Sequence, residues 1–322
     1  MRSSRTVGLP LALVSAFAFG GSGPAARPLL DAGLSPLDVT WLRLAGAAVV
    51  LLPLAVRHIG VARRRPLLIL AYGVLPMAGV QACYFAAVSR IPVGVALLIE
   101  YLGPVLMLGW VRFVRHWHVS RLSGIGAVLA VGGMTAVVEI WQGMRFDGVG
   151  IGLALCAAVC QSCYFLLADT GGEHVDPTAM IAQGAVVGAV VITVLARPWH
   201  LPWGVLAHDA ALGPFDWPAY VYVLWIALVT TVVAYLTGTV AVRLLSPQVA
   251  GVVSYLELVV ATVLAWLLLG EELSAPQLAG GVLVIAGAFL AQLATPTPDP
   301  KITKTPNYGE AFSAYSTENR SP

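Results

Sequence analysis

The sequence contains very few charged residues. Only 11% of its 322 residues are Asp, Glu, Lys or Arg, whereas a soluble domain has about 25%. Hydrophobic residues make up 58%, and the mean hydropathy is +0.84. A chain with so little charge cannot cover itself with a water-compatible surface, so lipid must be its main solvent. The net charge of +2 is too small to indicate a nucleic-acid partner.

Cysteines and catalytic motifs are equally scarce. All four cysteines (Cys83, Cys156, Cys160 and Cys163) lie in apolar stretches, which argues against a disulfide framework. Three of them share one face of a predicted helix, but a metal site would need a fuller set of ligands, so we expect no metal. No phosphate-binding loop, nucleotide fingerprint or nucleophile with an adjacent base is recognisable. We therefore expect neither an enzyme nor an ATP-driven pump, and no cofactor.

Long stretches with one charge or none divide the chain into spans. Because about 20 apolar residues cross the hydrocarbon core, the pattern predicts an all-α membrane protein of ten transmembrane helices. The predicted helices lie near 7–26, 37–56, 67–89, 92–112, 122–141, 149–168, 177–196, 218–241, 247–269 and 275–294. Residues 295–322 are rich in Pro, Ser and Thr and are predicted to form a disordered cytoplasmic tail.

Basic residues set the expected orientation. Of the 18 Lys and Arg residues, one (Arg43) lies within a span, four (Arg27, Arg90, Arg145 and Arg197) lie in predicted outer loops, and the other 13 lie in inner segments. This bias predicts a multi-pass inner-membrane protein with both termini in the cytoplasm. Trp199, Trp203 and Trp217 cluster in loop 197–217, which suits an interface on the outer side.

The two halves of the chain resemble each other. At an offset of 154, segment 101–140 aligns with 255–294 without gaps, and Gly126 and Gly133 meet Gly280 and Gly287. Each repeat then has five helices, covering residues 7–141 and 149–294. Because five is odd, the second copy must enter the membrane from the opposite side. Inverted repeats of this kind are typical of transporters that hold substrate near the membrane midplane.

Several motifs resemble those of the EamA branch of the drug/metabolite transporter superfamily. The second half has Ser246-Pro247, Ser254-Tyr255-Leu256-Glu257 and Leu269-Gly270-Glu271-Glu272-Leu273-Ser274; the first has Trp41-Leu42-Arg43-Leu44. The stretch from Ile91-Pro92-Val93-Gly94 to Glu100-Tyr101-Leu102-Gly103-Pro104 is similar to the threonine/homoserine exporter subgroup. The resemblance implies a transporter fold over residues 8–294. Leu258 departs from the pattern, because the branch usually has proline there.

Charged residues at membrane depth are the strongest candidates for a substrate site. A charge at the centre of a membrane helix costs roughly 2.5–3.5 kcal/mol, so one that remains usually faces a cavity or a partner. Glu100 and Glu257 lie three residues apart in the repeat frame, on one face. Arg43 is the expected counter-charge. The alternative is that these residues only hold helices together.

Neutral polar residues of the predicted spans could line the same cavity. Each alone is more often a helix-packing contact. The candidates are Gln81, Tyr84, Tyr101, Gln161, Tyr164, Tyr235 and Tyr255, with Thr230 and Ser254 beside them.

The predicted function is secondary export of amino acids or related small polar metabolites, with or without exchange for protons. The expected partners are a small-molecule substrate, the lipid bilayer and, if transport is coupled, protons; a homodimer is left open. Two alternatives stand: a membrane-embedded enzyme or scaffold acting on lipid-linked substrates, and multidrug efflux within the same fold. The inverted repeat favours the exporter.

Overall fold

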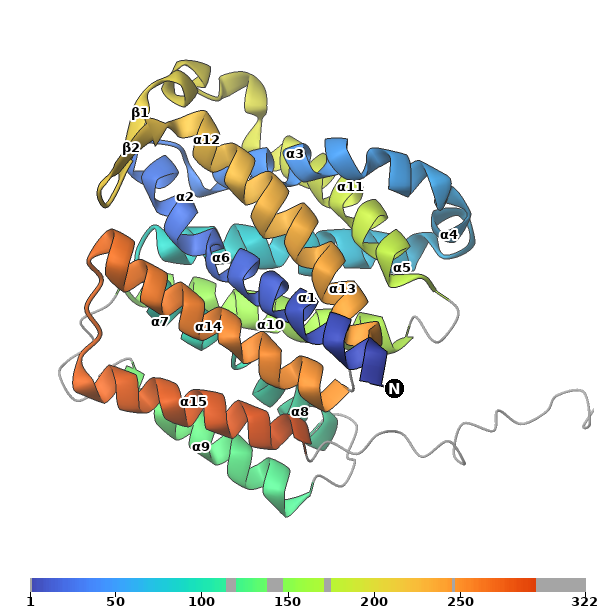
Figure 1. Ribbon diagram of the computed structural model, residues 1–322, viewed down its shortest axis with the longest axis vertical. Helices are drawn as coiled ribbons and strands as arrows, with labels where there is room; N and C mark the ends of the chain where they lie inside the picture. The colour runs from blue at the N-terminus through green and yellow to red at the C-terminus, as the bar shows by residue number, and fades with distance from the viewer. Residues whose placement is uncertain (1, 114–119, 138–146, 171–174, 245–246, 294–322) are drawn as a thin grey trace, which may run out of the picture.

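A computed structural model describes residues 2–113, 120–137, 147–170, 175–244 and 247–293, and in these residues helices form nearly the whole molecule (Figure 1). The first repeat contains α1 (Arg2–Gly20), α2 (Ser22–Asp31), α3 (Pro36–Arg57), α4 (Ile59–Arg64), α5 (Pro66–Tyr72), η1 (Gly73–Gly79), α6 (Val80–Val88), α7 (Val93–Glu100), α8 (Gly103–Phe113) and α9 (Arg121–Val137). The second contains α10 (Gly148–Thr170), α11 (Pro177–Ala196), η3 (Pro198–His200), η4 (Trp203–Ala207), β1 (Asp209–Leu212), β2 (Phe215–Pro218), α12 (Ala219–Leu224), η5 (Trp225–Val233), α13 (Ala234–Leu244), α14 (Pro247–Leu269) and α15 (Ala275–Leu293).

Both halves of the chain contain helices that are long enough to span a membrane. Five helical stretches in the described residues are long and apolar enough to cross a bilayer: Val7–Asp31, Pro36–Arg57, Pro66–Val88, Pro177–Ala196 and Ala219–Ala241. Shorter apolar helices, Arg121–Val137, Gly148–Cys163, Tyr255–Leu269 and Ala275–Leu290, pack beside them. The fold is that of a multi-pass, all-α membrane protein, as the sequence predicts. The first span is longer than expected, because α2 continues it to Asp31.

Equivalent helices of the two repeats begin in the same way. Ser35 caps α3: its hydroxyl accepts the Asp38 N–H at 3.2 Å, and the Asp38 carboxylate accepts the Ser35 N–H at 3.0 Å. Asp176 caps α11 by accepting the Thr178 N–H at 3.0 Å. A proline at the first helical position follows each cap, where its missing N–H has no effect on the helix. α3 and α11 then pack against each other.

The two repeats also match in their helix packing and in the position of a π-helical segment. An ideal Cβ at Gly133 of α9 would lie 2.6 Å from the Gly280 carbonyl oxygen of α15, and one at Gly287 would lie 2.5 Å from the Gly126 oxygen. These two contacts exchange under the 154-residue offset, as an inverted repeat requires. The π-helical segment η1, shifted by 154, falls on 227–233, inside η5.

The end of the molecule near Trp217 holds an element that the all-α prediction missed. β1 and β2 form a two-stranded antiparallel sheet in which Ala210 pairs with Trp217 and Leu212 with Phe215. Gly213 makes the turn with a φ of +58°, a conformation that glycine adopts without strain. The three tryptophans of this loop are exposed by 65%, 52% and 47%, and Figure 1 shows the hairpin beside α12 and α2. The predicted disordered tail, 295–322, lies outside the described residues.

Candidate functional site at a broken helix

The predicted span 92–112 is two helices rather than one. α7 ends at Glu100 and α8 begins at Gly103, with Tyr101 and Leu102 forming a turn between them. Pro104, at the second position of α8, has no N–H to give to the preceding turn. Ser162 of α10 donates a hydrogen bond to the Gly103 carbonyl at 2.8 Å, which ties the start of α8 to α10. Discontinuous helices in transporters place such helix ends at the substrate site.

The two predicted acids lie near this break. Glu100 is the last residue of α7, and its side chain is 8% exposed. Glu257, in the middle of α14, accepts a hydrogen bond from the Tyr101 hydroxyl at 2.8 Å. Glu100 is close enough to Glu257 and to Arg43 to interact with both electrostatically. In the described residues no basic side chain lies within 4.0 Å of either acid. The site therefore holds acids with no direct cationic partner.

The Tyr101 ring, whose hydroxyl binds Glu257, belongs to a row of three aromatic rings. Tyr101 and Tyr255 have ring centroids 5.6 Å apart, and Tyr255 meets Phe289 of α15 edge-on at 6.3 Å. Tyr255 precedes Glu257 by two residues in α14 and is buried. Three elements from both repeats thus contribute to one polar and aromatic cluster: the α7–α8 turn, α14 and α15.

Arg43 is buried, with 1% exposure, but it does not form the expected ion pair. Its Nε donates to Thr231 Oγ1 at 2.8 Å and its Nη2 donates to the Thr230 carbonyl at 3.0 Å. Its Nη1 donates to the Ser22 hydroxyl of α2. The guanidinium carbon also lies 5.5 Å from the centre of the Phe85 ring. Neutral groups of α2, η5 and α6 therefore hold this cation, within electrostatic range of Glu257 and Glu100.

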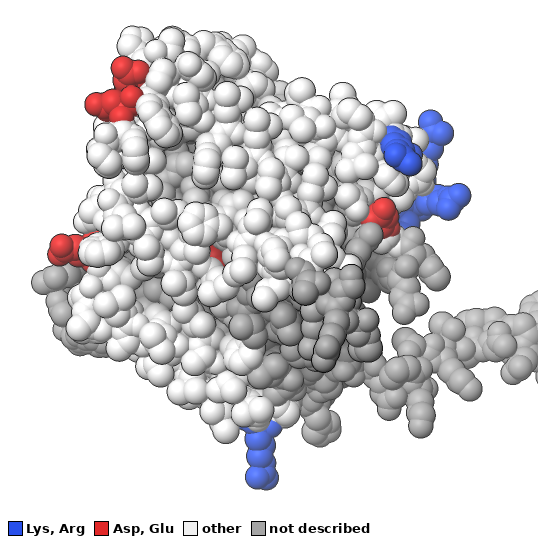
Figure 2. All heavy atoms as spheres, in the orientation of Figure 1, with Lys and Arg blue, Asp and Glu red and all other residues white. Residues whose placement is uncertain are grey.

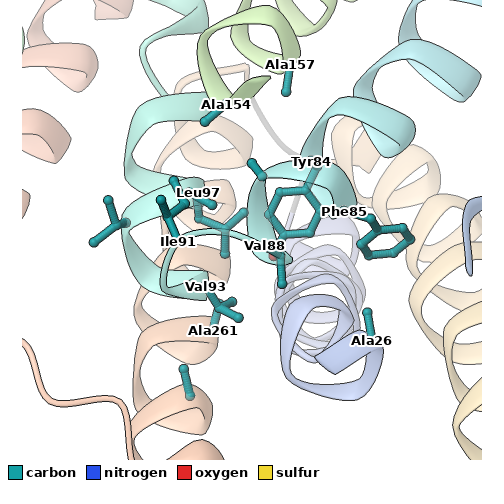
Figure 3. Close-up of a cluster of buried hydrophobic side chains, with 14 of the residues drawn as sticks. Ala26, Tyr84, Phe85, Val88, Ile91, Val93, Leu97, Ala154, Ala157 and Ala261 are labelled. Atoms are coloured by element: carbon teal, nitrogen blue, oxygen red, sulfur yellow. The ribbon is translucent and has the colours of Figure 1, made fainter. Parts of the chain in front are cut away.

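Tyr84 lies within electrostatic range of Arg43, Glu100 and Glu257. Its ring is 4% exposed, and its hydroxyl has no hydrogen-bond partner in the described part of the chain. An added Cβ on Gly23 would contact that hydroxyl and Val93, so α2 passes directly against it. Figure 3 shows Tyr84 and Phe85 of α6 in a cluster with Ala26 of α2, Val93 and Leu97 of α7, and Ala261 of α14.

The other candidates are more widely distributed. Gln81 is buried in α6, one turn before Tyr84. Gln161 of α10 lies against the helix break, since an added Cβ on Gly103 would be 3.5 Å from its Cγ. Tyr235 of α13 packs edge-on against Phe19 of α1 at 4.8 Å and lies within electrostatic range of Arg43. The side chains of Tyr164 and Ser254 lie outside the described part of the structure.

Two features of the site were missed by the sequence analysis. The helix break carries a visible signal, because Gly103-Pro104 is a strong interruption of a helical pattern. The partners of Arg43 carry a weaker one: Thr230 was predicted to line a cavity rather than to bind Arg43, and it lies with Thr231 in the π-helical segment η5.

Two helical repeats, a broken helix and acidic side chains beside the break are typical of secondary transporters. A family model confirms this class, matching residues 6–138 and 148–293. The chain belongs to the EamA-like transporter family.

Named relatives span most of the chain. It is 27% identical over 257 residues to the threonine/homoserine exporter RhtA of Salmonella typhimurium, covering 78% of this chain and 80% of the relative. RhtA of Escherichia coli K12 is 26% identical over 283 residues, covering 86% and 88%. A probable amino-acid metabolite efflux pump of Salmonella typhimurium is 28% identical over 271 residues, covering 82% and 85%. A solved crystal structure shares the fold with a TM-score of 0.60 and 18% identity over 90% of this chain and 98% of that one.

Proposed function

We propose that this transporter exports amino acids or closely related small polar metabolites across the inner membrane. The observation that carries the proposal is the position of Glu100, a buried acid at a helix break with no cationic side chain within 4.0 Å in the described residues. The names of two relatives, a threonine/homoserine exporter and a probable amino-acid metabolite efflux pump, support the same substrate class.

In this proposal Glu100 binds the ammonium group of the substrate or, in its absence, a proton. Glu257, held by the Tyr101 hydroxyl, supplies a second negative charge nearby. Competition between amine and proton for one carboxylate gives exchange: a proton enters as the substrate leaves. The two five-helix repeats, 7–141 and 149–294, are the units that move relative to each other, since the site takes residues from both.

The charge distribution supports an orientation with both termini in the cytoplasm. Figure 2 shows basic side chains gathered around the α4 end of the molecule and acidic ones at the β1–β2 end. Two arginines of the predicted outer loops are paired: Arg27 with Asp31 at 3.2 Å, and Arg90 with Asp147 at 2.6 Å. The Arg90 hydrogen bond, with the Val149 N–H, lowers the pKa of Asp147. Cytoplasmic segments are those with an excess of Lys and Arg.

Reporter fusions test this orientation. A reporter that is active only in the periplasm should be active when fused after residue 205, in the loop at the hairpin end, and silent when fused after residue 300. A cytoplasmic reporter should give the reverse pattern. Periplasmic activity after residue 300 would contradict the proposed helix count and, with it, the cytoplasmic position of the C-terminus.

Metabolite profiling tests the exported substrate class. Cells that produce the protein should accumulate amino acids in the medium, threonine and homoserine among them, above the level of cells that produce the Glu100→Gln variant at equal membrane abundance. The variant keeps the side-chain shape and removes the charge that the substrate amine would meet. Identical amino-acid profiles from both strains would contradict amino-acid export, and a difference confined to lipophilic compounds would favour multidrug efflux.

A further inference from the structure

The motif Leu269–Ser274 between α14 and α15 contains a carboxylate, that of Glu271, which caps neither helix. Gly270 ends α14 with a φ of +67°, the left-handed conformation of a helix C-cap. Ser274 and Gln277 begin α15 as a reciprocal cap: the Ser274 N–H donates to Gln277 Oε1 at 2.9 Å, and the Gln277 N–H donates to Ser274 Oγ at 3.3 Å. The Glu271 side chain takes part in neither of these caps, whereas its backbone N–H donates to the Ala265 carbonyl of α14 at 3.2 Å.

Glu271 instead reaches the other repeat. Its two carboxylate oxygens accept the Val93 N–H at 2.9 and 3.1 Å, across 178 residues of sequence. The neighbouring Gly94 N–H also points to it. Val93 is the first residue of α7, so the carboxylate sits at the positive end of that helix. Burial raises the pKa of Glu271, whereas the two N–H groups and Arg27 act in the opposite direction.

The element that Glu271 holds is the one that carries Glu100. α7 has only eight residues, about 12 Å of helix, and all of them are buried. Its first residue contacts Glu271 and its last is Glu100. At the Glu100 end, the turn at Tyr101 and Leu102 separates α7 from α8, so α7 is a separate short helix whose last residue lies at the site.

We propose that Glu271 is the positioning residue that fastens α7 to the second repeat, and that release of the Glu271–Val93 contact opens the path between the site and the hairpin end of the molecule. This step rests on the proposed transport function but not on the identity of the substrate. The contact joins the two repeats through backbone N–H donors and the Glu271 carboxylate. Arg27 interacts electrostatically with this carboxylate and donates to the Val88 carbonyl at the end of α6. Breaking the Glu271–Val93 contact frees one end of α7 without unfolding the helix.

Cysteine accessibility tests the proposal directly. In a chain whose four native cysteines are replaced by alanine, Ala96→Cys places one thiol on α7, where the wild-type side chain is fully buried. A membrane-impermeant maleimide, added from each side in intact cells and in inverted vesicles, measures its exposure. Glu271→Ala should speed labelling from the hairpin side about tenfold, the factor that loss of one charge-assisted hydrogen bond allows. Glu272→Ala, an exposed acid in the same loop, is the matched control and should leave the rate unchanged.

A second variant removes the donor instead of the acceptor. Val93→Pro deletes the N–H at the first position of α7, where proline is compatible with a helix, and Pro92 before it already has an extended ψ of 144°. Val93→Pro should speed labelling as Glu271→Ala does, and the double variant should add little, because both remove one contact. Unchanged labelling in both folded single variants, equal acceleration in Glu272→Ala, or acceleration only from the opposite side would overturn the proposal. If labelling changes as expected while no amino acid is exported, the proposed substrate is wrong and the role of Glu271 stands.

Discussion

Gly133→Leu and Gly280→Leu should each remove most of the folded protein. At Gly133 an added Cβ would lie 2.6 Å from the Gly280 carbonyl oxygen and 2.8 Å from the Val284 backbone nitrogen; at Gly280 it would meet the Gly133 oxygen at 2.6 Å. The obstacles include backbone atoms of the facing helix, so no rotamer change relieves the overlap. Overpacking of this kind costs about 1–3 kcal/mol, and the branched leucine side chain should exceed that range.

The neighbouring glycine provides a control of opposite sign. Gly132 lies in the same helix, but nothing lies within 4 Å of its added Cβ. Gly132→Ala should be neutral or stabilising, since alanine favours a helix by about 1 kcal/mol over glycine, whereas Gly133→Ala should destabilise. The midpoint of thermal unfolding in detergent and the yield of monodisperse protein distinguish the Gly132→Ala variant from the Gly133→Ala variant. Equal behaviour of Gly132 and Gly133 variants would remove close helix packing as the basis of the α9–α15 contact.

The spans and the repeat could be read from the sequence because lipid imposes simple rules. Charged residues such as Arg65 and Arg90 limit a span, since a charge inside hydrocarbon is costly. The helix-starting Ser35-Pro36 and Asp176-Pro177 follow from local capping chemistry. Gly133 and Gly287 mark the repeat because a close backbone contact tolerates no Cβ at either position.

The remaining features depend on contacts that no local pattern specifies. Arg43 was expected to face an acid, but Thr231 and Ser22 come from distant helices whose position only the tertiary fold determines. The hairpin at Asp209–Pro218 is stabilised partly from outside the strands, through the Tyr222 hydroxyl, which donates to the Ala210 carbonyl at 3.0 Å. Glu271 lies in the connection between α14 and α15, and its partner lies 178 residues away.

Glu100→Gln should have the largest effect on transport. Glu100 is 8% exposed and lies at the end of α7, so a glutamine fits the same space but cannot balance the charge of an ammonium group or exchange a proton. Loss of a charge-assisted contact with substrate corresponds to at least about a tenfold loss of rate. Glu257→Gln should be milder, because its amide oxygen can still accept the Tyr101 hydroxyl. Glu272→Gln removes an exposed charge outside the site and should leave the rate unchanged.

Uptake of labelled threonine into inverted membrane vesicles tests the exporter site most directly. In inverted vesicles, export appears as uptake of substrate. If the protein exchanges substrate for protons, an acidic vesicle interior should accelerate this uptake, because protons leave as substrate enters. Wild-type uptake is expected to rise with the gradient, and Glu100→Gln at equal folded abundance is expected to lose both the rate and its response to the gradient. Wild-type uptake that ignores the gradient would contradict proton exchange and leave facilitated export. Wild-type rates in both Glu100→Gln and Glu257→Gln would contradict the site itself.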